Sequence, residues 1–293
     1  MTASNGRNIG RVVALVIPVG VFLSLAACTI DNGPTGLLIE QDQWLDTGTS
    51  TNAGTCSVPA AATSTERGEG VLDVAVLDEY HTHYLFYPLV ENQLASLAGL
   101  ASGSGTTSPA DEKNNIVMDS FHVELNVATS DGSSFLWDPG CSGEFDVPTG
   151  TATLAPGGTL STSVEIIRPC NAAPLFRYLQ GLSNNHEPYP AIEVTTNIRA
   201  VGYLGSSRIK SPPFDFKVTA CYGCLQHGYS DSAAAQFAFP FIPQCSDLAA
   251  NPYNGDPCNP AQDDLVLCCA TSWDAEGHAQ GMECPGIPTA SAH

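Results

Sequence analysis

Histidines in two segments of the sequence have spacings that suit a metal site. His81 and His83 flank a threonine, and His122 stands two residues before Glu124 in a run that alternates apolar and polar residues. Residues two apart point to the same side of a β-strand, so each pair would lie on one face. If the two strands pair in register, three imidazoles and a carboxylate would converge on zinc or copper.

The alternative is that these histidines are polar positions on a solvent-facing strand, which is the far more common arrangement. Nothing in the sequence establishes that the two strands are neighbours. We therefore assign no metal ion or other cofactor from the sequence, and keep His81, His83 and His122 as the candidates for a metal-binding alternative.

The motif Cys221-Tyr222-Gly223-Cys224 offers a second kind of chemistry. A thiol-redox site needs its first cysteine at a helix N-terminus, where the pKa of the thiol falls, but the residues after Cys224 are typical of a turn. Covalent haem attachment needs a histidine directly after the second cysteine, and that residue is Leu225. Zinc would need two further cysteines. Because the N-terminal features described below predict export, and lipidation of Cys28 would leave ten cysteines, disulfides are favoured over all three.

No catalytic pattern is evident elsewhere in the chain. There is no Gly-x-Ser-x-Gly nucleophile elbow and no glycine-rich nucleotide loop, and the acidic C-terminal residues lack the spacing of a calcium loop. The formal net charge is −20, from 30 acidic and 10 basic residues. Such a charge opposes binding to nucleic acid and to anionic lipid surfaces. We expect no catalytic residues and no nucleic-acid partner.

The N-terminal segment points to export. Arg7 and Arg11 form a basic start, and residues 12–27 are an apolar run that is short for a membrane span and closes on small residues. The tetrapeptide Leu25-Ala26-Ala27-Cys28 resembles the lipobox of bacterial lipoproteins at all four positions. The resemblance implies that a lipoprotein signal peptidase cuts before Cys28, after a diacylglyceryl group has been attached to its thiol.

The same resemblance carries expectations about location. Thr29 follows the lipobox cysteine where an aspartate usually marks retention at the inner membrane, so the outer membrane is favoured. Stable attachment takes more than one acyl chain, which a lipidated cysteine supplies. The expected partners are the membrane, through this anchor, and a protein or other envelope component. The alternative is an ordinary signal peptide, or a single membrane anchor, with an incidental cysteine.

The number of cysteines agrees with lipidation. There are 11, an odd number, and use of Cys28 in a thioether leaves ten for five disulfides. The adjacent Cys268 and Cys269 would bridge to separate partners. We predict one pairing, Cys141–Cys170, which would close a loop over the expected helix and contribute about 3–4 kcal/mol. The expected disulfide cysteines are Cys56, Cys141, Cys170, Cys221, Cys224, Cys245, Cys258, Cys268, Cys269 and Cys284.

Composition divides the chain into four parts. Residues 1–27 are the signal peptide, and residues 28–70, rich in Thr, Ser, Gly and Ala, are the lipidated N-terminus and a flexible tether. Residues 71–220 carry the strand patterns of a β-sandwich domain. Residues 221–293 form a cysteine-rich tail, with 7 cysteines and no Lys or Arg. Disulfides must order this tail, because it has too little apolar material for a core of its own.

Seven short segments have the composition and alternation of strands, and one segment has that of a helix. The helix begins at Cys170, with Asn171 as its cap, and ends at Gly181. The expected fold is therefore mostly β: an antiparallel immunoglobulin-like sandwich with one short helix and a disulfide-stapled tail. The expected strands span residues 71–77, 82–90, 121–127, 134–137, 160–166, 192–200 and 214–219.

One motif within the body resembles a known family. The residues Leu154-Ala155-Pro156-Gly157-Gly158-Thr159-Leu160 are similar to the Leu-x-Pro-Gly-x-Ser entry to a middle strand in bacterial immunoglobulin-like domains. Taken together, the patterns predict a non-enzymatic, lipid-anchored envelope lipoprotein that acts in structure or binding at the cell periphery. The alternative is a metal-binding or thiol-redox envelope lipoprotein.

Overall fold

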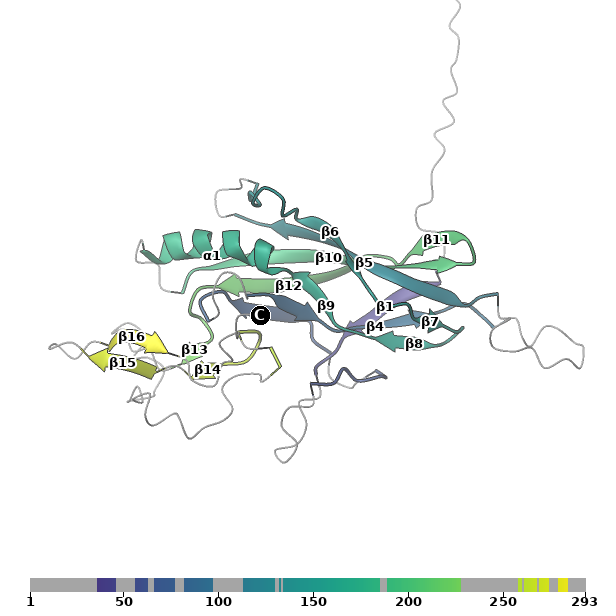
Figure 1. Ribbon diagram of the computed structural model, residues 1–293, viewed down its shortest axis with the longest axis horizontal. Helices are drawn as coiled ribbons and strands as arrows, with labels where there is room; N and C mark the ends of the chain where they lie inside the picture. The colour runs from purple at the N-terminus through teal and green to yellow at the C-terminus, as the bar shows by residue number, and fades with distance from the viewer. Residues whose placement is uncertain are drawn as a thin grey trace, which may run out of the picture. The chain divides into compact units, whose positions relative to one another are not determined.

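The computed structural model describes most of the body of the chain (Figure 1). All described residues belong to one compact unit, Pro34–His293. The lipobox, Cys28 and His81 lie outside the described residues. Within the described part, no helix is long and apolar enough to cross a membrane. The described residues are 36–45, 56–62, 66–76, 82–96, 113–129, 132, 134–184, 189–227, 258–259, 261–267, 269–273 and 279–283.

The larger of two β-layers is a seven-stranded sheet. Its main path runs in the order β2-β12-β10-β5-β6, with β11 added to β10 and β7 added to β5. All pairs are antiparallel except β2 with β12, which is parallel. The bounds are β2 Glu69–Asp73, β5 Ile116–Val127, β6 Glu144–Pro148, β7 Thr153–Leu154, β10 Ala191–Leu204, β11 Ser207–Lys210 and β12 Phe214–Cys221.

The smaller layer packs on one face of the larger sheet. Only the single residue Tyr87 separates β3 from β4, so the strand predicted over residues 82–90 is present but interrupted. Phe86 lies with its ring centroid 5.1 Å from that of Phe216 in β12, and these two fully buried rings join the layers. The smaller layer consists of β1 Leu37–Asp42, β4 Pro88–Asn92 and β8 Thr159–Ser161, with β3 Tyr84–Phe86 paired to β9 Val164–Ile167.

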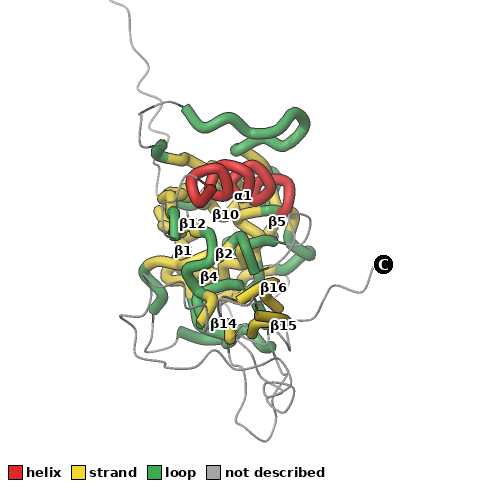
Figure 2. The backbone as a smooth tube through the Cα atoms, turned by 90° about the vertical axis from the view of Figure 1, so that its left-hand side faces the viewer, coloured by secondary structure: helices red, strands yellow, loops and turns green. Residues whose placement is uncertain are grey.

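The one helix among the described residues, α1 (Pro169–Asn184), lies across the same inward face. Its first turn is tied to Ser142, just before β6, and Phe176 packs on Tyr222, just after β12. In the sheet order, β6 and β12 flank the two central strands β5 and β10, so the helix spans these central strands. Figure 2 shows the helix end-on beside them. Asn171 does not cap the helix, and Gly181 does not end it.

The fold class expected from the sequence is confirmed: the protein is mostly β, an open antiparallel sandwich with one helix. A tight turn at Gly205 joins β10 to β11, and Gly205 has the positive φ of 61° that such a turn requires. Pro212 and Pro213, which cannot donate backbone hydrogen bonds, lie between β11 and β12. However, β8 is an edge strand rather than a middle one.

The prediction that residues 28–70 are a flexible tether is wrong for the part that the structure describes. Leu37 and Ile39 are 0% and 4% exposed, and β1 pairs along its length with β4. Arg67 is also buried, and β2 begins at Glu69 rather than at residue 71. A polar composition hid a strand whose few apolar residues alternate toward the core.

The tail closes the open side of the sandwich, where β2 and β3 each have a free edge. Asp73 in β2 donates its N–H to Ala261 O (2.9 Å), and Asp263 donates its N–H to Val71 O (2.9 Å). The side-chain amide of Gln262 pairs with both backbone groups of Leu85 in β3, at 2.9 and 2.7 Å. The tail therefore satisfies two strand edges that would otherwise expose unpaired backbone.

Three disulfides are present among the described residues: Cys56–Cys258, Cys141–Cys170 and Cys221–Cys224. The pairing Cys141–Cys170 is the one predicted. Cys56–Cys258 joins the supposed tether to the tail across 202 residues of sequence. Cys245, Cys268 and Cys284 lie outside the described residues, and only the backbone of Cys269 is described, in β15 (Cys269–Trp273), which pairs with β16 (Ala279–Glu283). A short parallel pair, β13 (Gln226–His227) and β14 (Val266–Leu267), completes the tail.

We expect Gln262→Ala to lower the free energy of unfolding by about 1–3 kcal/mol, because the N–H and C=O of Leu85 lose their partners. Chemical denaturation of the oxidised protein measures the change. Leu265→Ala, in the same segment but 53% exposed, is the matched control and should change stability by less than about 0.5 kcal/mol. Equal effects of the two substitutions would contradict an edge-closing role for Gln262.

Candidate functional site

The structure does not bring together His83 and His122, the two candidate histidines that it describes. The strand after His83 is β3, which pairs with β9 in the smaller layer, whereas His122 lies in β5 of the larger sheet. His122 points to the outward face of that sheet, away from the smaller layer, because its neighbours Phe121 and Val123 fill the core. The condition for convergence of His83 with His122 is therefore not met, because the two strands belong to different layers.

His122 instead meets carboxylates from the edge strand β6. The register places His122 opposite Asp146 and Glu124 opposite Glu144. Asp146 Oδ1 lies 2.8 Å from His122 Nδ1. On the other side of the ring, Glu124 Oε1 and Glu144 Oε1 lie 3.3 and 3.5 Å from His122 Nε2. One imidazole and three carboxylates thus form the most concentrated set of potential metal ligands on this face.

This cluster is negatively charged and faces solvent. The side chain of His122 is 14% exposed, whereas those of Glu124, Glu144 and Asp146 are 43%, 68% and 53% exposed. Within the described part of the chain, His122 is the ion-pair partner that the three carboxylates share. Arg199 lies opposite His122 in β10, but its guanidinium donates to Asn197 Oδ1. Three negative charges therefore share a single imidazole.

Sequence reasoning found His122 and Glu124 but missed Glu144 and Asp146. These two residues flank Phe145 in β6, a strand of five residues that the sequence analysis did not predict. The signal was present: Glu144, Phe145, Asp146 and Val147 alternate polar and apolar residues up to Pro148. Its short length made it inconspicuous, and its pairing with β5 could not be read from composition.

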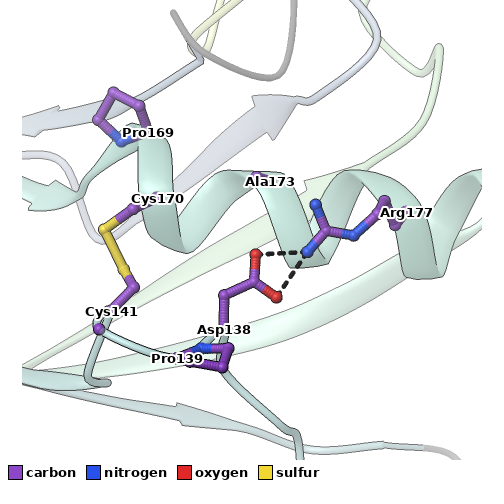
Figure 3. A pocket seen from close by; sticks show the side chains of 8 residues that line it. Asp138, Pro139, Cys141, Pro169, Cys170, Ala173 and Arg177 are labelled. Atoms are coloured by element: carbon purple, nitrogen blue, oxygen red, sulfur yellow. Dashed lines mark hydrogen bonds and ion pairs between the residues drawn. A yellow bond between two sulfur atoms is a disulfide. The ribbon is translucent and has the colours of Figure 1, made fainter.

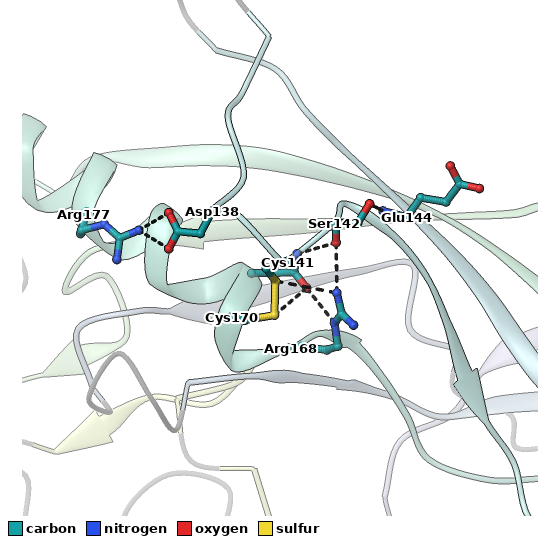
Figure 4. The surroundings of a disulfide bond; sticks show 8 residues. Asp138, Cys141, Ser142, Glu144, Arg168, Cys170 and Arg177 are labelled. Atoms are coloured by element: carbon teal, nitrogen blue, oxygen red, sulfur yellow. Dashed lines mark hydrogen bonds and ion pairs between the residues drawn. A yellow bond between two sulfur atoms is a disulfide. The ribbon is translucent and has the colours of Figure 1, made fainter.

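The start of β6 is fixed in place by the disulfide Cys141–Cys170 and by Arg168 (Figure 4). Arg168 donates to the Ser142 carbonyl at 3.0 Å, and its guanidinium carbon lies 3.6 Å from the centroid of the Phe145 ring. The Ser142 hydroxyl accepts the Glu144 N–H at 3.0 Å. The helix start therefore holds the strand that carries Glu144 and Asp146.

A shallow pocket beside α1 is a less promising site (Figure 3). Its charged residues, Asp138 and Arg177, bond to each other, with Arg177 Nη2 donating to both carboxylate oxygens at 2.7 and 2.5 Å. The other lining residues are proline, glycine, alanine and the two cysteines of the disulfide, so the pocket presents neither a nucleophile nor a base. The lining residues are Asp138, Pro139, Gly140, Cys141, Pro169, Cys170, Ala173 and Arg177.

The Cys221–Cys224 pair is closed as a disulfide at the end of β12. It lies after a strand rather than at the start of a helix, so the arrangement that lowers a thiol pKa is missing here. The buried Asp73 accepts the N–H groups of Ala75, Gly223 and Leu225 at 2.8–3.0 Å. Burial raises the pKa of Asp73, although these three donors act in the opposite direction. The carboxylate fixes the disulfide loop to β2.

A buried cluster of charges lies where the tail meets both layers. Arg67 Nη1 donates to Asp263 Oδ2 at 2.6 Å, and the Tyr84 hydroxyl lies 3.0 Å from the same oxygen. Asp42 Oδ2 is 3.7 Å from Arg67 Nε, too far for a hydrogen bond, so both of these buried atoms are unsatisfied among the described residues. The cluster joins β1, β3 and the tail, and its burial makes it structural.

Burial controls the ionisation of this cluster. It raises the pKa of Asp42 from its ordinary value of 3.8 to about 7, even though Arg67 and the Tyr87 N–H favour the charged form. Burial likewise raises the pKa of Asp263, against the opposing effect of Arg67. Tyr84 has its pKa raised by burial and then by Asp263. The folded protein therefore binds protons here that the unfolded chain releases.

Comparisons with known proteins add no activity. No protein-family model matches the chain, and no curated protein matches its sequence. A crystal structure of a protein from Archaeoglobus fulgidus is similar over 46% of this chain and 82% of its own, with 10% identity and a TM-score of 0.27. At that distance the likeness supports no argument about fold or function.

The buried Asp42 predicts a stability that falls as pH rises. Between about pH 4 and pH 7 the folded state keeps the proton on Asp42 while the unfolded state loses it. The free energy of unfolding therefore decreases by at most about 1.4 kcal/mol per pH unit from this one group, and the loss is complete above its folded pKa. Denaturation curves measured from pH 4 to pH 8 give the slope.

The substitution Asp42→Asn removes this titration and should flatten the curve over the same range. Asp119→Asn, at an exposed position of β5, is the matched control and should keep the wild-type slope. An unchanged slope in the Asp42→Asn protein would contradict the proton uptake assigned to this carboxyl.

Proposed function

We propose that this chain is an exported, lipid-anchored envelope protein whose sandwich acts in structure or binding at the cell periphery. The observation that carries the proposal is the tetrapeptide Leu25-Ala26-Ala27-Cys28 after a short apolar run. A lipidated Cys28 would place the body in an oxidising compartment, where disulfides persist. The outer membrane is the proposed location.

The disulfides of the body support this proposal. Three pairs among the described residues account for Cys56, Cys141, Cys170, Cys221, Cys224 and Cys258. Disulfides of this kind are rare in reducing compartments. One of them joins Cys56 to Cys258 in the tail, and the first described strand, β1, begins at Leu37. Such a body suits presentation of a rigid surface.

The outward face of the larger sheet is the proposed binding surface. Along β10 the residues Glu193, Thr195, Asn197 and Arg199 alternate with buried ones, and neither the smaller layer nor α1 covers them. With His122 and the carboxylates of β6, they form a polar surface on rigid strands. The described pocket and the closed disulfide Cys221–Cys224 give no comparable support for catalysis.

Metabolic labelling with a palmitate analogue tests the anchor. We expect the wild-type chain to carry the label and to fractionate with the membrane, and Cys28→Ser to lose both, because the thiol is the site of acylation. Thr29→Asp is the matched control: it should keep the label and shift the protein toward the inner membrane. A labelled, membrane-bound Cys28→Ser protein would show that the anchor assignment is wrong.

Intact mass separates a structural role of the cysteines from a redox role. We expect alkylation of the native mature protein to add no label, and alkylation after reduction to modify all ten cysteines other than Cys28. Two thiols that react in the native protein, before any reductant is added, would favour the thiol-redox alternative instead.

A further inference from the structure

We propose that His122, Glu124 and Glu144 form a binding site for a first-row divalent metal ion, with zinc as the preferred ion, and that Asp146 orients the histidine. The site lies on the outward face of the larger sheet, where β5 pairs with the edge strand β6. The inference is independent of the lipid anchor, because it depends only on the geometry of these two strands.

The first argument is the distance between the ligand atoms. His122 Nε2 is 3.3 Å from Glu124 Oε1 and 3.5 Å from Glu144 Oε1. Two ligands of a tetrahedral zinc ion, each bound at 2.0–2.1 Å, lie about 3.4 Å apart. All three ligand atoms are within 4.8 Å of one another. A metal ion can therefore bind all three through small side-chain rotations and without backbone movement.

The second argument is the partner of the Nδ1 ring nitrogen of His122. Asp146 Oδ1 lies 2.8 Å from Nδ1, the distance of a hydrogen bond between a ring nitrogen and a carboxylate. Nε2, the other ring nitrogen, is the atom that faces Glu124 Oε1 and Glu144 Oε1. A metal ion between these three atoms would be coordinated by all of them. A histidine that donates its other N–H to a carboxylate is the usual outer-shell arrangement of a metal ligand.

The third argument is the charge on the paired strands. Glu124 and Glu144 are direct cross-strand neighbours, and like charges in that position destabilise a sheet. Even a fully protonated His122 leaves the four side chains with a net charge of about −2. In the described part of the chain no Lys or Arg makes an ion pair with either glutamate. A divalent cation supplies the missing charge.

The ligand chemistry selects the class of ion. One imidazole nitrogen with carboxylate oxygens suits zinc and neighbouring transition metals, whereas magnesium and calcium prefer oxygen ligands alone. Both glutamates face solvent, with side chains 43% and 68% exposed, so a fourth coordination position remains accessible to water or to a ligand from a partner.

Zinc titration of the full-length, oxidised protein, followed by calorimetry and by elemental analysis after dialysis, tests the proposal. We expect one zinc ion per chain, and no comparable binding of magnesium or calcium. His122→Gln and Glu144→Gln should each weaken zinc binding at least tenfold, and Asp146→Asn by about 10–100-fold. Glu193→Gln, which removes an exposed carboxylate paired with Lys217 on the same face, is the matched control and should bind as the wild type does.

Two results would overturn the proposal. The first is a wild-type protein that keeps no stoichiometric zinc. The second is unchanged zinc affinity in both His122→Gln and Glu144→Gln, which would place the metal elsewhere. Glu144 is exposed, so its substitution tests the site without disturbing the core. As a second measurement, the cobalt(II) complex should lack a thiolate charge-transfer band; such a band would assign the metal to cysteines and contradict the site. Neither outcome depends on whether Cys28 is lipidated.

Discussion

The side chains of residues 121–125 in β5 and 191–200 in β10 alternate between the buried core and the solvent-facing side of the sheet, and the arrangement of the two layers depends on that alternation. Phe121 and Val123 enter the core, and His122 between them faces outward. The inward face can be covered only by other apolar surfaces, so the smaller layer and α1 pack there. The outward face is left polar and open, and the candidate metal site is on it.

An open sandwich leaves strand edges with unpaired backbone groups. Here the C-terminal tail covers the edges of β2 and β3. The backbone of Ala261 and Asp263 extends the edge of β2, and Gln262 satisfies the edge of β3. Ala261 and Asp263 adopt positive φ values of 76° and 62°, a backbone conformation that costs free energy in residues other than glycine. The hydrogen bonds that this segment makes to the edges of β2 and β3 offset that cost.

The closure also explains the buried charges. Arg67 precedes β2 and Asp263 lies in the tail, so their ion pair forms only when the two segments meet at Tyr84. Moving charges out of water costs more free energy than their mutual attraction returns, unless the charges are well paired. Asp42 does not fully meet this condition, because its Oδ2 has no hydrogen-bond partner among the described residues. We interpret the cluster as the contact that specifies where the tail docks. The disulfide Cys56–Cys258 adds a covalent link between the segment before Arg67 and the tail.

The sequence by itself determined the local features. The alternation of residues 121–127 fixed which side chains face the core, Gly205 fixed a turn, and Cys141 found its predicted partner in Cys170. The lipobox prediction concerns residues outside the described structure and stays a prediction. Each of these depends on residues that are close in sequence or on a short motif, so periodicity and composition suffice to detect it.

Only the tertiary structure decided which distant residues meet. The register of β5 with β6 brought Glu144 and Asp146 to His122, and the separation of the layers kept His83 away. Likewise, β1 entered the core from a segment whose composition predicted a tether, because its pairing with β4 buried its few apolar residues. Strand pairing is non-local: a strand carries its own alternation in sequence, but its neighbour and register depend on how the whole core packs.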